Sequence, residues 1–245
     1  MIPKIIHYCW FGKKELPKLA RKCIASWKKY MPEYEIKEWN EDNFDVNIIP
    51  YTRQAYENKK YAFVADYTRF YILNKFGGIY LDTDVELIKS LDDLISNKIV
   101  MGFERVGYVN PGLILISPSN QLFLQEMLKL YDNLSFTNFD NSLNLKTIVE
   151  YTTEQLIKKG LKKENIYQEL DNNICIYPID YFCPIDMQTN KLVITKNTYS
   201  IHHFAASWIS SWGKFKRIIR KIIGSRVYNY LHELKSKVKR AINRE

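Results

Sequence analysis

The fold is decided by residues 65–86, which read ADYTRFYILNKFGGIYLDTDVE. Apolar side chains recur at helical spacing from Tyr61 to Phe76, and the following Gly77-Gly78 is typical of the turn that ends a helix. Residues 79–81 then form a short apolar strand that runs into the acidic motif Asp82-Thr83-Asp84. A helix, a glycine turn and a strand in this order predict an α/β fold.

Strands and helices alternate on both sides of this stretch. We expect further helices that start near Pro17, at Ser119 and at Thr153. Short apolar or alternating runs predict strands at 5–10, 34–39, 99–103, 113–116, 174–177, 192–195 and 199–204. This alternation indicates layers of helices around a mixed, mainly parallel sheet. Since there is no internal repeat and no low-complexity linker, residues 1–212 are expected to form one domain.

The net positive charge of the chain is confined to its last part. The whole sequence carries +9, and residues 213–245 hold eleven Lys or Arg and two Glu, so residues 1–212 are neutral. A protein that grips nucleic acid would spread basic side chains through its fold, so nucleic acid is not an expected partner. In the tail, apolar residues recur at three- and four-residue steps between basic ones, which predicts a basic amphipathic helix. Such a helix either binds an anionic membrane surface or docks on the domain.

Hydropathy and cysteine spacing indicate the cellular setting. No apolar run approaches the roughly 20 residues that span a bilayer, and the opening MIPKIIH lacks the features of a signal peptide. The cysteines at 9, 23, 175 and 183 form neither a C-x-x-C pair nor a zinc-binding pattern, so we expect reduced thiols. Together with the basic tail, these features predict a cytoplasmic protein that is peripheral on the inner face of the cell membrane.

Two carboxylates follow the predicted strand at 79–81. Residues two apart in a strand face the same side, so Asp82 and Asp84 are expected to project together at its carboxyl end, where open α/β sheets bind ligands. Such a pair suits Mn²⁺ or Mg²⁺, which prefer oxygen ligands and keep positions open for phosphate. On the preceding helix Asp66 and Arg69 share a face, and their expected partners are sugar hydroxyls and phosphate oxygens.

These motifs together resemble glycosyltransferase family 32, which includes fungal mannosyltransferases and many bacterial capsule or lipopolysaccharide transferases. The run Asp66-x-x-Arg69 followed by Gly77-Gly78-Ile79-Tyr80-Leu81-Asp82-x-Asp84 resembles its D-x-D sugar-binding region. The same spacing is found in the large clostridial glucosylating toxins. Residues 2–12 resemble the first strand of the family, and Ile201-His202-His203 with Ser207-Trp208 resembles its closing motif. The resemblance covers residues 2–208 and leaves out the basic tail.

The resemblance implies a GT-A fold and a retaining, metal-dependent hexosyltransferase. The implied donor is a nucleotide sugar, with a UDP-sugar favoured over GDP-mannose. The implied acceptor is a polysaccharide or a lipid-linked glycan in capsule or lipopolysaccharide synthesis.

The same resemblance implies a role for each site residue. Trp10 would stack on the nucleotide base, and Asp66, Arg69, Tyr80 and Asp82 would contact the donor. Asp82 and Asp84 would bind the metal with His202, or alternatively His203, since neighbouring strand residues face opposite sides. Ser207 and Trp208 would close over the diphosphate. The implied catalytic residues are Asp82, Asp84 and Arg69.

Plainer interpretations stay open. Trp10 could be a core aromatic, Asp66 and Arg69 a surface ion pair, and Asn110-Pro111-Gly112 a simple turn instead of part of the sugar pocket. A haloacid-dehalogenase-type phosphatase also carries D-x-D after a strand, but it needs Thr or Val where this chain has Glu86. A non-catalytic sugar-binding protein or membrane scaffold with the same fold is the third alternative.

Overall fold

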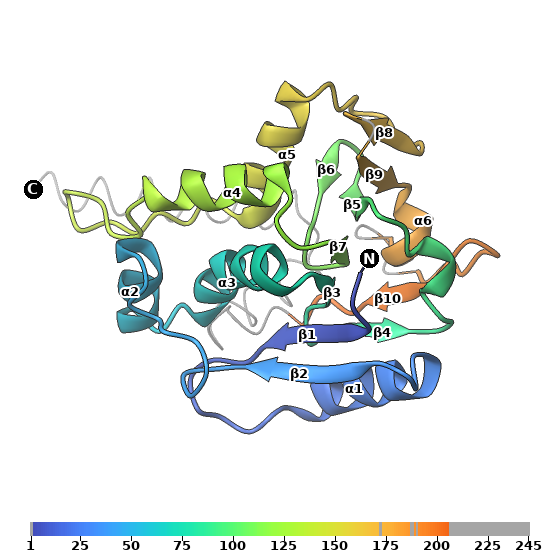
Figure 1. Ribbon diagram of the computed structural model, residues 1–245, viewed down its shortest axis with the longest axis horizontal. Helices are drawn as coiled ribbons and strands as arrows, with labels where there is room; N and C mark the ends of the chain where they lie inside the picture. The colour runs from blue at the N-terminus through green and yellow to red at the C-terminus, as the bar shows by residue number, and fades with distance from the viewer. Residues whose placement is uncertain (1, 172, 187–188, 190, 206–245) are drawn as a thin grey trace, which may run out of the picture. The chain divides into compact units, whose positions relative to one another are not determined.

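The computed structural model of the chain describes residues 2–171, 173–186, 189 and 191–205 (Figure 1). The described residues up to Phe204 form one compact unit. The predicted tail at 213–245 and the predicted domain end at residue 212 lie outside the described residues. Within the described part, no helix is long and apolar enough to cross a bilayer.

Strands and helices alternate along this unit, as predicted. The strands are β1 Ile5–Cys9, β2 Glu35–Trp39, β3 Gly78–Tyr80, β4 Val85–Leu87, β5 Ile99–Arg105, β6 Tyr108–Val109, β7 Leu115–Ser117, β8 Gln168–Leu170, β9 Ile174–Tyr177 and β10 Ser200–His202. The helices are α1 Lys18–Tyr30, α2 Pro50–Glu57, α3 Tyr61–Phe76, α4 Leu122–Asp132, α5 Ile148–Lys158 and α6 Ile179–Phe182, with a 3-10 turn η1 at Asp92–Leu94.

The main sheet is mixed and has the strand order β2-β1-β3-β7-β5-β9-β8, with β6 added to β5. Pairing is parallel between β1 and both its neighbours and between β5 and β9, whereas β7 is antiparallel to β3 and β5. A second, two-stranded sheet pairs β10 with β4. The predicted α/β fold with a mixed sheet is confirmed.

The sheet buries an apolar layer on each face. Ile99, Met101 and Phe103 of β5 belong to the cluster that packs under α2, α3 and α4, whereas Val100 belongs to the cluster shared with α1 and β4. This is the strand alternation that a two-sided core requires. Figure 1 shows α2, α3 and α4 gathered on one side of β1 and β2, with α1 on the other.

The acidic motif lies in a turn that directly follows the carboxyl end of β3. β3 ends at Tyr80, and the amide of Val85 donates to the carbonyl of Asp82 at 3.0 Å, which closes a β-turn over residues 82–85. The expectation that Asp82 and Asp84 project together, as residues two apart in one strand do, is therefore wrong. The turn directs the two carboxylates to different partners.

Three further expectations about the elements are wrong in detail. Residues 192–195 form no strand and contribute only an isolated bridge between Ile185 and Leu192. Helix α4 begins at Leu122 instead of Ser119. Helix α5 begins at Ile148, well before the predicted start, because Thr147 and Glu150 form a capping box there.

Candidate active site

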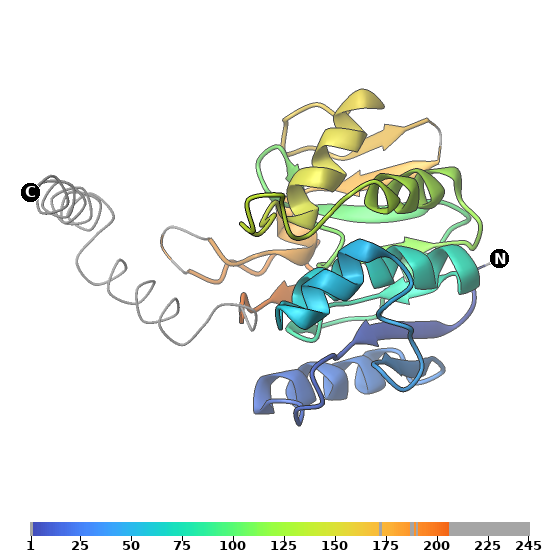
Figure 2. The same ribbon diagram turned by 90° about the vertical axis from the view of Figure 1, so that its left-hand side faces the viewer.

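The candidate residues gather where the central strands end. Because β7 is antiparallel to both β3 and β5, the strands β2, β1, β3 and β5 all point the same way, and their carboxyl ends share one edge of the sheet. The chain order reverses on either side of β1, which makes this edge the expected ligand crevice. Strands β1 and β2 point left in Figure 1, so the edge faces the viewer in Figure 2.

A buried arginine joins the two predicted acidic motifs. Nη2 of Arg69 lies 3.0 Å from Oδ1 of Asp66 and 3.1 Å from Oδ1 of Asp82. The hydroxyl of Tyr80 donates to the same Asp82 oxygen at 3.1 Å, and the Arg69 guanidinium lies 4.8 Å from the Tyr80 ring centroid. The Arg69 side chain is only 3% exposed, so the alternative of a surface ion pair is wrong.

This cluster combines high charge with incomplete pairing. Burial raises the pKa of the Asp66 carboxyl to about 7, with Arg69 opposing that rise and Asp82 adding to it. Nε and Nη1 of Arg69 are buried and have no hydrogen-bond partner among the described residues. Buried donors without partners are costly, and at a ligand crevice they indicate groups that a ligand would satisfy. Their number and geometry suit hydroxyl or phosphate oxygens.

A second pair lies beside this cluster, in the turn after β3. Nε2 of His202 is 3.3 Å from Oδ1 of Asp84, and the amide of His203 donates to the Asp84 carbonyl at 2.9 Å. Burial disfavours charge on His202, but the Asp84 carboxylate and then the Cys183 side chain outweigh it and raise its pKa to about 10. The neighbouring His203 turns to the other side and pairs with Glu86 at 2.7 Å.

This arrangement can supply two ligands to a divalent cation. Two ligand atoms each about 2.1 Å from one ion stand about 3 Å apart when they are adjacent in its shell, which matches the Asp84 and His202 atoms at 3.3 Å. Of the two histidines, the structure brings His202 and not His203 to the acidic motif. Asp82 has one oxygen taken by Arg69 and Tyr80. Among the described residues no group of three or more His, Cys, Asp and Glu side chains is arranged to hold a metal ion.

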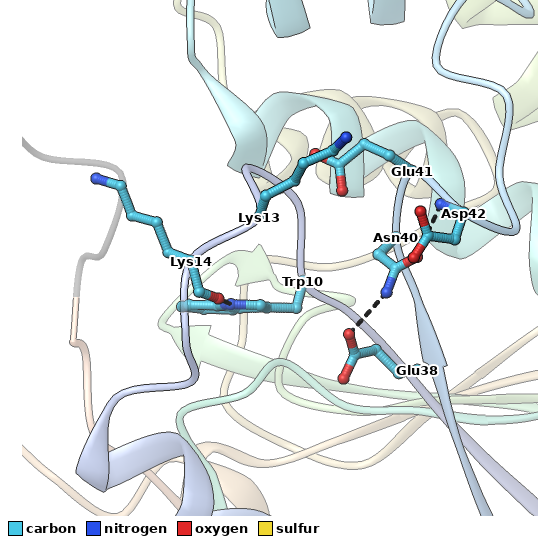
Figure 3. Close-up of a pocket in the computed structure, with 7 residues that line it drawn as sticks. All are labelled: Trp10, Lys13, Lys14, Glu38, Asn40, Glu41 and Asp42. Carbon is cyan, nitrogen blue, oxygen red and sulfur yellow. Dashed lines mark hydrogen bonds between the residues drawn. The ribbon is translucent and has the colours of Figure 1, made fainter.

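Trp10, directly after β1, lines a pocket of about 300 Å³ (Figure 3). Its ring is half-buried, and its Nε1 donates to the Lys14 carbonyl at 2.5 Å. Below and beside the ring lie Glu38 and Asn40 at the end of β2, with the Asn40 amide donating to Glu38 at 2.9 Å. An accessible indole next to amide and carboxylate groups can stack on a flat ring and hydrogen-bond its edge. The geometry is therefore suitable for a nucleotide base.

Three residues at this edge were not predicted as site residues from the sequence. Glu104 was not considered, and Asn110 and Gly112 were left open as part of a simple turn. The amide of Asp82 donates to the Gly112 carbonyl at 2.9 Å, and the Gly112 amide donates to Oδ1 of Asn110 at 2.7 Å. A Cβ on Gly112 would stand 2.0 Å from Oδ2 of Asp82. The other end of the Asn110 side chain donates to Glu104 at 2.5 Å. The Asn-Pro-Gly turn signal was visible, but nothing in the sequence around Glu104 marked it as part of the site.

The described residues end before two of the predicted site residues. Ser207 and Trp208, which the resemblance places over the diphosphate, lie outside the described part of the chain. The other predicted residues all lie at or next to the carboxyl edge of β1 and β3.

The sequence matches known glycosyltransferases over its first part. Residues 17–101 match the family model described as the glycosyltransferase sugar-binding region containing the DXD motif. Inositol phosphoceramide mannosyltransferase 3 of Schizosaccharomyces pombe is 36% identical over 98 residues, which are 38% of this chain and 27% of that protein. An uncharacterized glycosyltransferase of Acanthamoeba polyphaga mimivirus is 37% identical over 101 residues, which are 39% of this chain and 40% of that protein. The matched segment thus spans less than half the length of either relative.

Among solved structures, the PaToxG glycosyltransferase superposes with a TM-score of 0.50 at 19% sequence identity, covering 65% of this chain and 70% of that one. At this identity the likeness concerns the fold alone. The resemblance of the chain to the DXD glycosyltransferases is confirmed, and residues 17–101 carry their sugar-binding region. That region holds Asp66, Arg69, Tyr80, Asp82 and Asp84, and the match favours a transferase over the phosphatase alternative.

Proposed function

We propose that the protein is a glycosyltransferase that moves a hexose from a nucleotide sugar to a hydroxyl group of a glycan or glycolipid acceptor. The observation that carries the proposal is the buried cluster in which Arg69 joins Asp66 and Asp82 at the ligand-binding edge. Its unpartnered guanidinium nitrogens belong to residues 17–101, the segment that matches the sugar-binding region with the DXD motif. The half-buried Trp10 beside its pocket supplies a place for the base at the same edge.

In this proposal each residue of the site binds a different part of the nucleotide sugar. Trp10 stacks on the base, Asp66 accepts hydrogen bonds from sugar hydroxyls, and Arg69 donates to them or to the diphosphate. Asp84 and His202 would hold a divalent cation, Mn²⁺ or Mg²⁺, with Asp82 as a third ligand. The bound ion would supply Lewis-acid stabilisation of the leaving diphosphate. We further propose that transfer retains the anomeric configuration.

The identity of the donor is the least constrained part of the proposal. The resemblance favours a UDP-sugar, whereas two fungal relatives carry mannosyl transfer in their names: the S. pombe protein, and mannosyl phosphorylinositol ceramide synthase SUR1 of Saccharomyces cerevisiae, which is 29% identical over 100 residues. Both names also contain an inositol-linked ceramide. We propose a lipid-linked glycan as the acceptor here, in bacterial capsule or lipopolysaccharide synthesis.

A membrane-bound acceptor agrees with the basic amphipathic sequence at 213–245. We propose that this tail attracts anionic headgroups and keeps the enzyme peripheral on the inner face of the cell membrane. Deleting residues 213–245 should weaken binding to phosphatidylglycerol vesicles much more than it weakens donor hydrolysis. Equal vesicle binding by the full and shortened chains would contradict a membrane role for the tail.

A donor screen tests the proposed activity. The full chain is incubated with UDP-glucose, UDP-galactose, their N-acetyl forms and GDP-mannose, with Mn²⁺ or with EDTA, and nucleoside diphosphate is measured. We expect slow release from one donor without acceptor, and loss of that release with EDTA. Failure to release nucleoside diphosphate from any donor, or release of inorganic phosphate from phosphate esters instead, would overturn the proposal.

A further inference from the structure

Glu104 lies on the far side of the acidic motif from the base pocket. Along the carboxyl edge the strands follow the order β2, β1, β3, β7 and β5. Asn40 and Trp10 follow β2 and β1, Asp82 follows β3, and Glu104 is the penultimate residue of β5. A nucleotide sugar with its base at Trp10 and its diphosphate near Asp82 therefore extends its hexose towards Glu104.

Glu104 is tied to the acidic motif by a short chain of contacts. One carboxylate oxygen accepts from Nδ2 of Asn110 at 2.5 Å. Oδ1 of that asparagine and Oδ2 of Asp82 stand 3.0 and 2.0 Å from the Cβ position of Gly112, so they lie within about 5 Å of each other. With the width of an amide group added, the Glu104 and Asp82 carboxylates are at most about 10 Å apart. In glycosidases the two carboxyl groups that flank the scissile glycosidic bond stand about 5–9.5 Å apart, which lies within this limit.

The position of the Glu104 carboxylate is fixed by Asn110. The ladder between β5 and β6 shifts register between Phe103 and Arg105, so strand alternation does not assign Glu104 to a face of the sheet. The hydrogen bond from Nδ2 of Asn110 instead holds the Glu104 carboxylate at the turn of residues 110–112 beside Asp82.

The charge of Glu104 is not compensated within the described residues. Asp66 and Asp82 share Arg69, Asp84 faces His202, and Glu86 has Lys22 and His203. No ion pair to Glu104 occurs in the part of the chain that the structure describes, and its side chain is only half-buried. A carboxylate held by a neutral amide and only half-buried is placed to meet positive charge that arises during a reaction.

We propose that the Glu104 carboxylate faces the transferred sugar and stabilises the positive charge that develops at its anomeric carbon. This inference rests on the proposed glycosyltransferase function. In the reaction the bond between the anomeric carbon and the phosphate oxygen breaks, and its electron pair goes to that oxygen. The acceptor oxygen then bonds to the anomeric carbon, and its proton passes to the phosphate oxygen. Glu104 forms no covalent bond and supplies negative charge beside the ring.

The variant Glu104→Gln tests this role because its amide oxygen can still accept from Asn110 while the charge is lost. We expect kcat for donor hydrolysis and for transfer to fall about 10²- to 10³-fold. The dissociation constant of the nucleoside diphosphate with Mn²⁺ should change less than twofold, and the melting temperature should be preserved. The matched control is Glu169→Gln, which removes a carboxylate paired with Lys98 at the far strands of the sheet and should leave kcat unchanged.

A second variant covers the case in which Glu104→Gln alters the local structure. In Glu104→Ala, added formate should restore part of the lost turnover if a negative charge beside the sugar is what matters. Near-normal kcat in Glu104→Gln, or parallel loss of nucleotide binding and stability in both variants without formate rescue, would overturn the role of Glu104. Absence of wild-type turnover with every donor would instead overturn the proposed function itself.

Discussion

Two histidines whose side chains lie at opposite ends of β3 are buried to a similar degree and yet have opposite electrostatic surroundings. At the amino end His7, 1% exposed, lies 3.0 Å from the Gly77 carbonyl and accepts from the Trp39 indole at 3.1 Å. Beyond the carboxyl end His202, 7% exposed, faces the Asp84 carboxylate at 3.3 Å. Burial, with Lys37 nearby and the Gly77 carbonyl opposing, lowers the pKa of His7 to about 4, whereas the pKa of His202 rises to about 10.

The comparison distinguishes the amino end of β3, where the contacts stabilise the fold, from its carboxyl end, where the candidate site residues lie. At the amino end both ring nitrogens of His7 are paired, His7, Trp39 and Phe76 pack as rings, and Lys37 lies over the Trp39 and Phe76 rings. At the carboxyl end carboxylates, a guanidinium and an imidazole are brought together, and two Arg69 nitrogens keep no partner among the described residues. Natural proteins concentrate such unsatisfied and charged groups where they bind or react. Changes at the two ends should therefore affect different properties.

The largest effect is expected for Asp84→Asn at the carboxyl end. This change removes the negative charge of the proposed metal ligand, so turnover should fall at least about 10²- to 10³-fold. The fold should persist, because burial favours the neutral form of His202 once the carboxylate is gone. Nucleoside diphosphate release and thermal unfolding measure the two properties. Near-normal turnover in this variant would end the metal proposal, and Asp93→Asn, an exposed aspartate in η1, is the matched control.

A pair of glycine substitutions sharpens the contrast between the two ends. Gly112→Ala puts a Cβ 2.0 Å from the Asp82 carboxylate, which must then move. Since small displacements of reacting groups can cost about 10²-fold in rate, we expect a loss of that order in turnover per folded molecule. The measurement is kcat, normalised to the folded fraction.

The matched change at the amino end is Gly78→Ala. Gly78 has φ +112° and its Cβ would meet the Ile5 carbonyl at 2.8 Å, so this variant should lose about 1–3 kcal/mol of stability. Its folded fraction should keep its turnover. If Gly78→Ala lost turnover and Gly112→Ala did not, the division between the ends would be wrong.

The same contrast explains how far the sequence predicted this molecule. The long periodic helix α3 was predictable and runs from Tyr61 to Phe76 as expected. The apolar run of β9, Ile174 to Tyr177, was also predicted. The α/β fold was predicted as well. Short elements set by tertiary contacts were not, such as β4, which exists because β10 returns to pair with it. Residues 192–195 have the composition of a strand but lack a ladder partner.

For the site, the family resemblance predicted which residues take part but not which side chains they contact. That Arg69 joins Asp66 to Asp82 depends on how α3 crosses β3, which no spacing encodes. Glu104 enters the site only because β7 lies between β3 and β5 and brings their carboxyl ends to one edge. Strand order is a property of the whole chain, so its contribution to the site is invisible in any single motif.

The smallest effect is expected at the amino end, in the response of stability to pH. An unfolded histidine takes up its proton near pH 6.5 and folded His7 only near pH 4, so the unfolded state binds more protons between these values. The free energy of unfolding should therefore decrease as the pH falls from 6.5 to 4, by up to about 3 kcal/mol from this residue. His7→Gln stays neutral and should lack this decrease. Asp66, whose raised pKa acts in the opposite direction over the same range, is present in both proteins and cancels in the difference. Urea unfolding of both proteins at pH 7 and pH 4.5 measures that difference, and equal pH dependence would mean that His7 is protonated in the folded state and that the amino end carries charge after all.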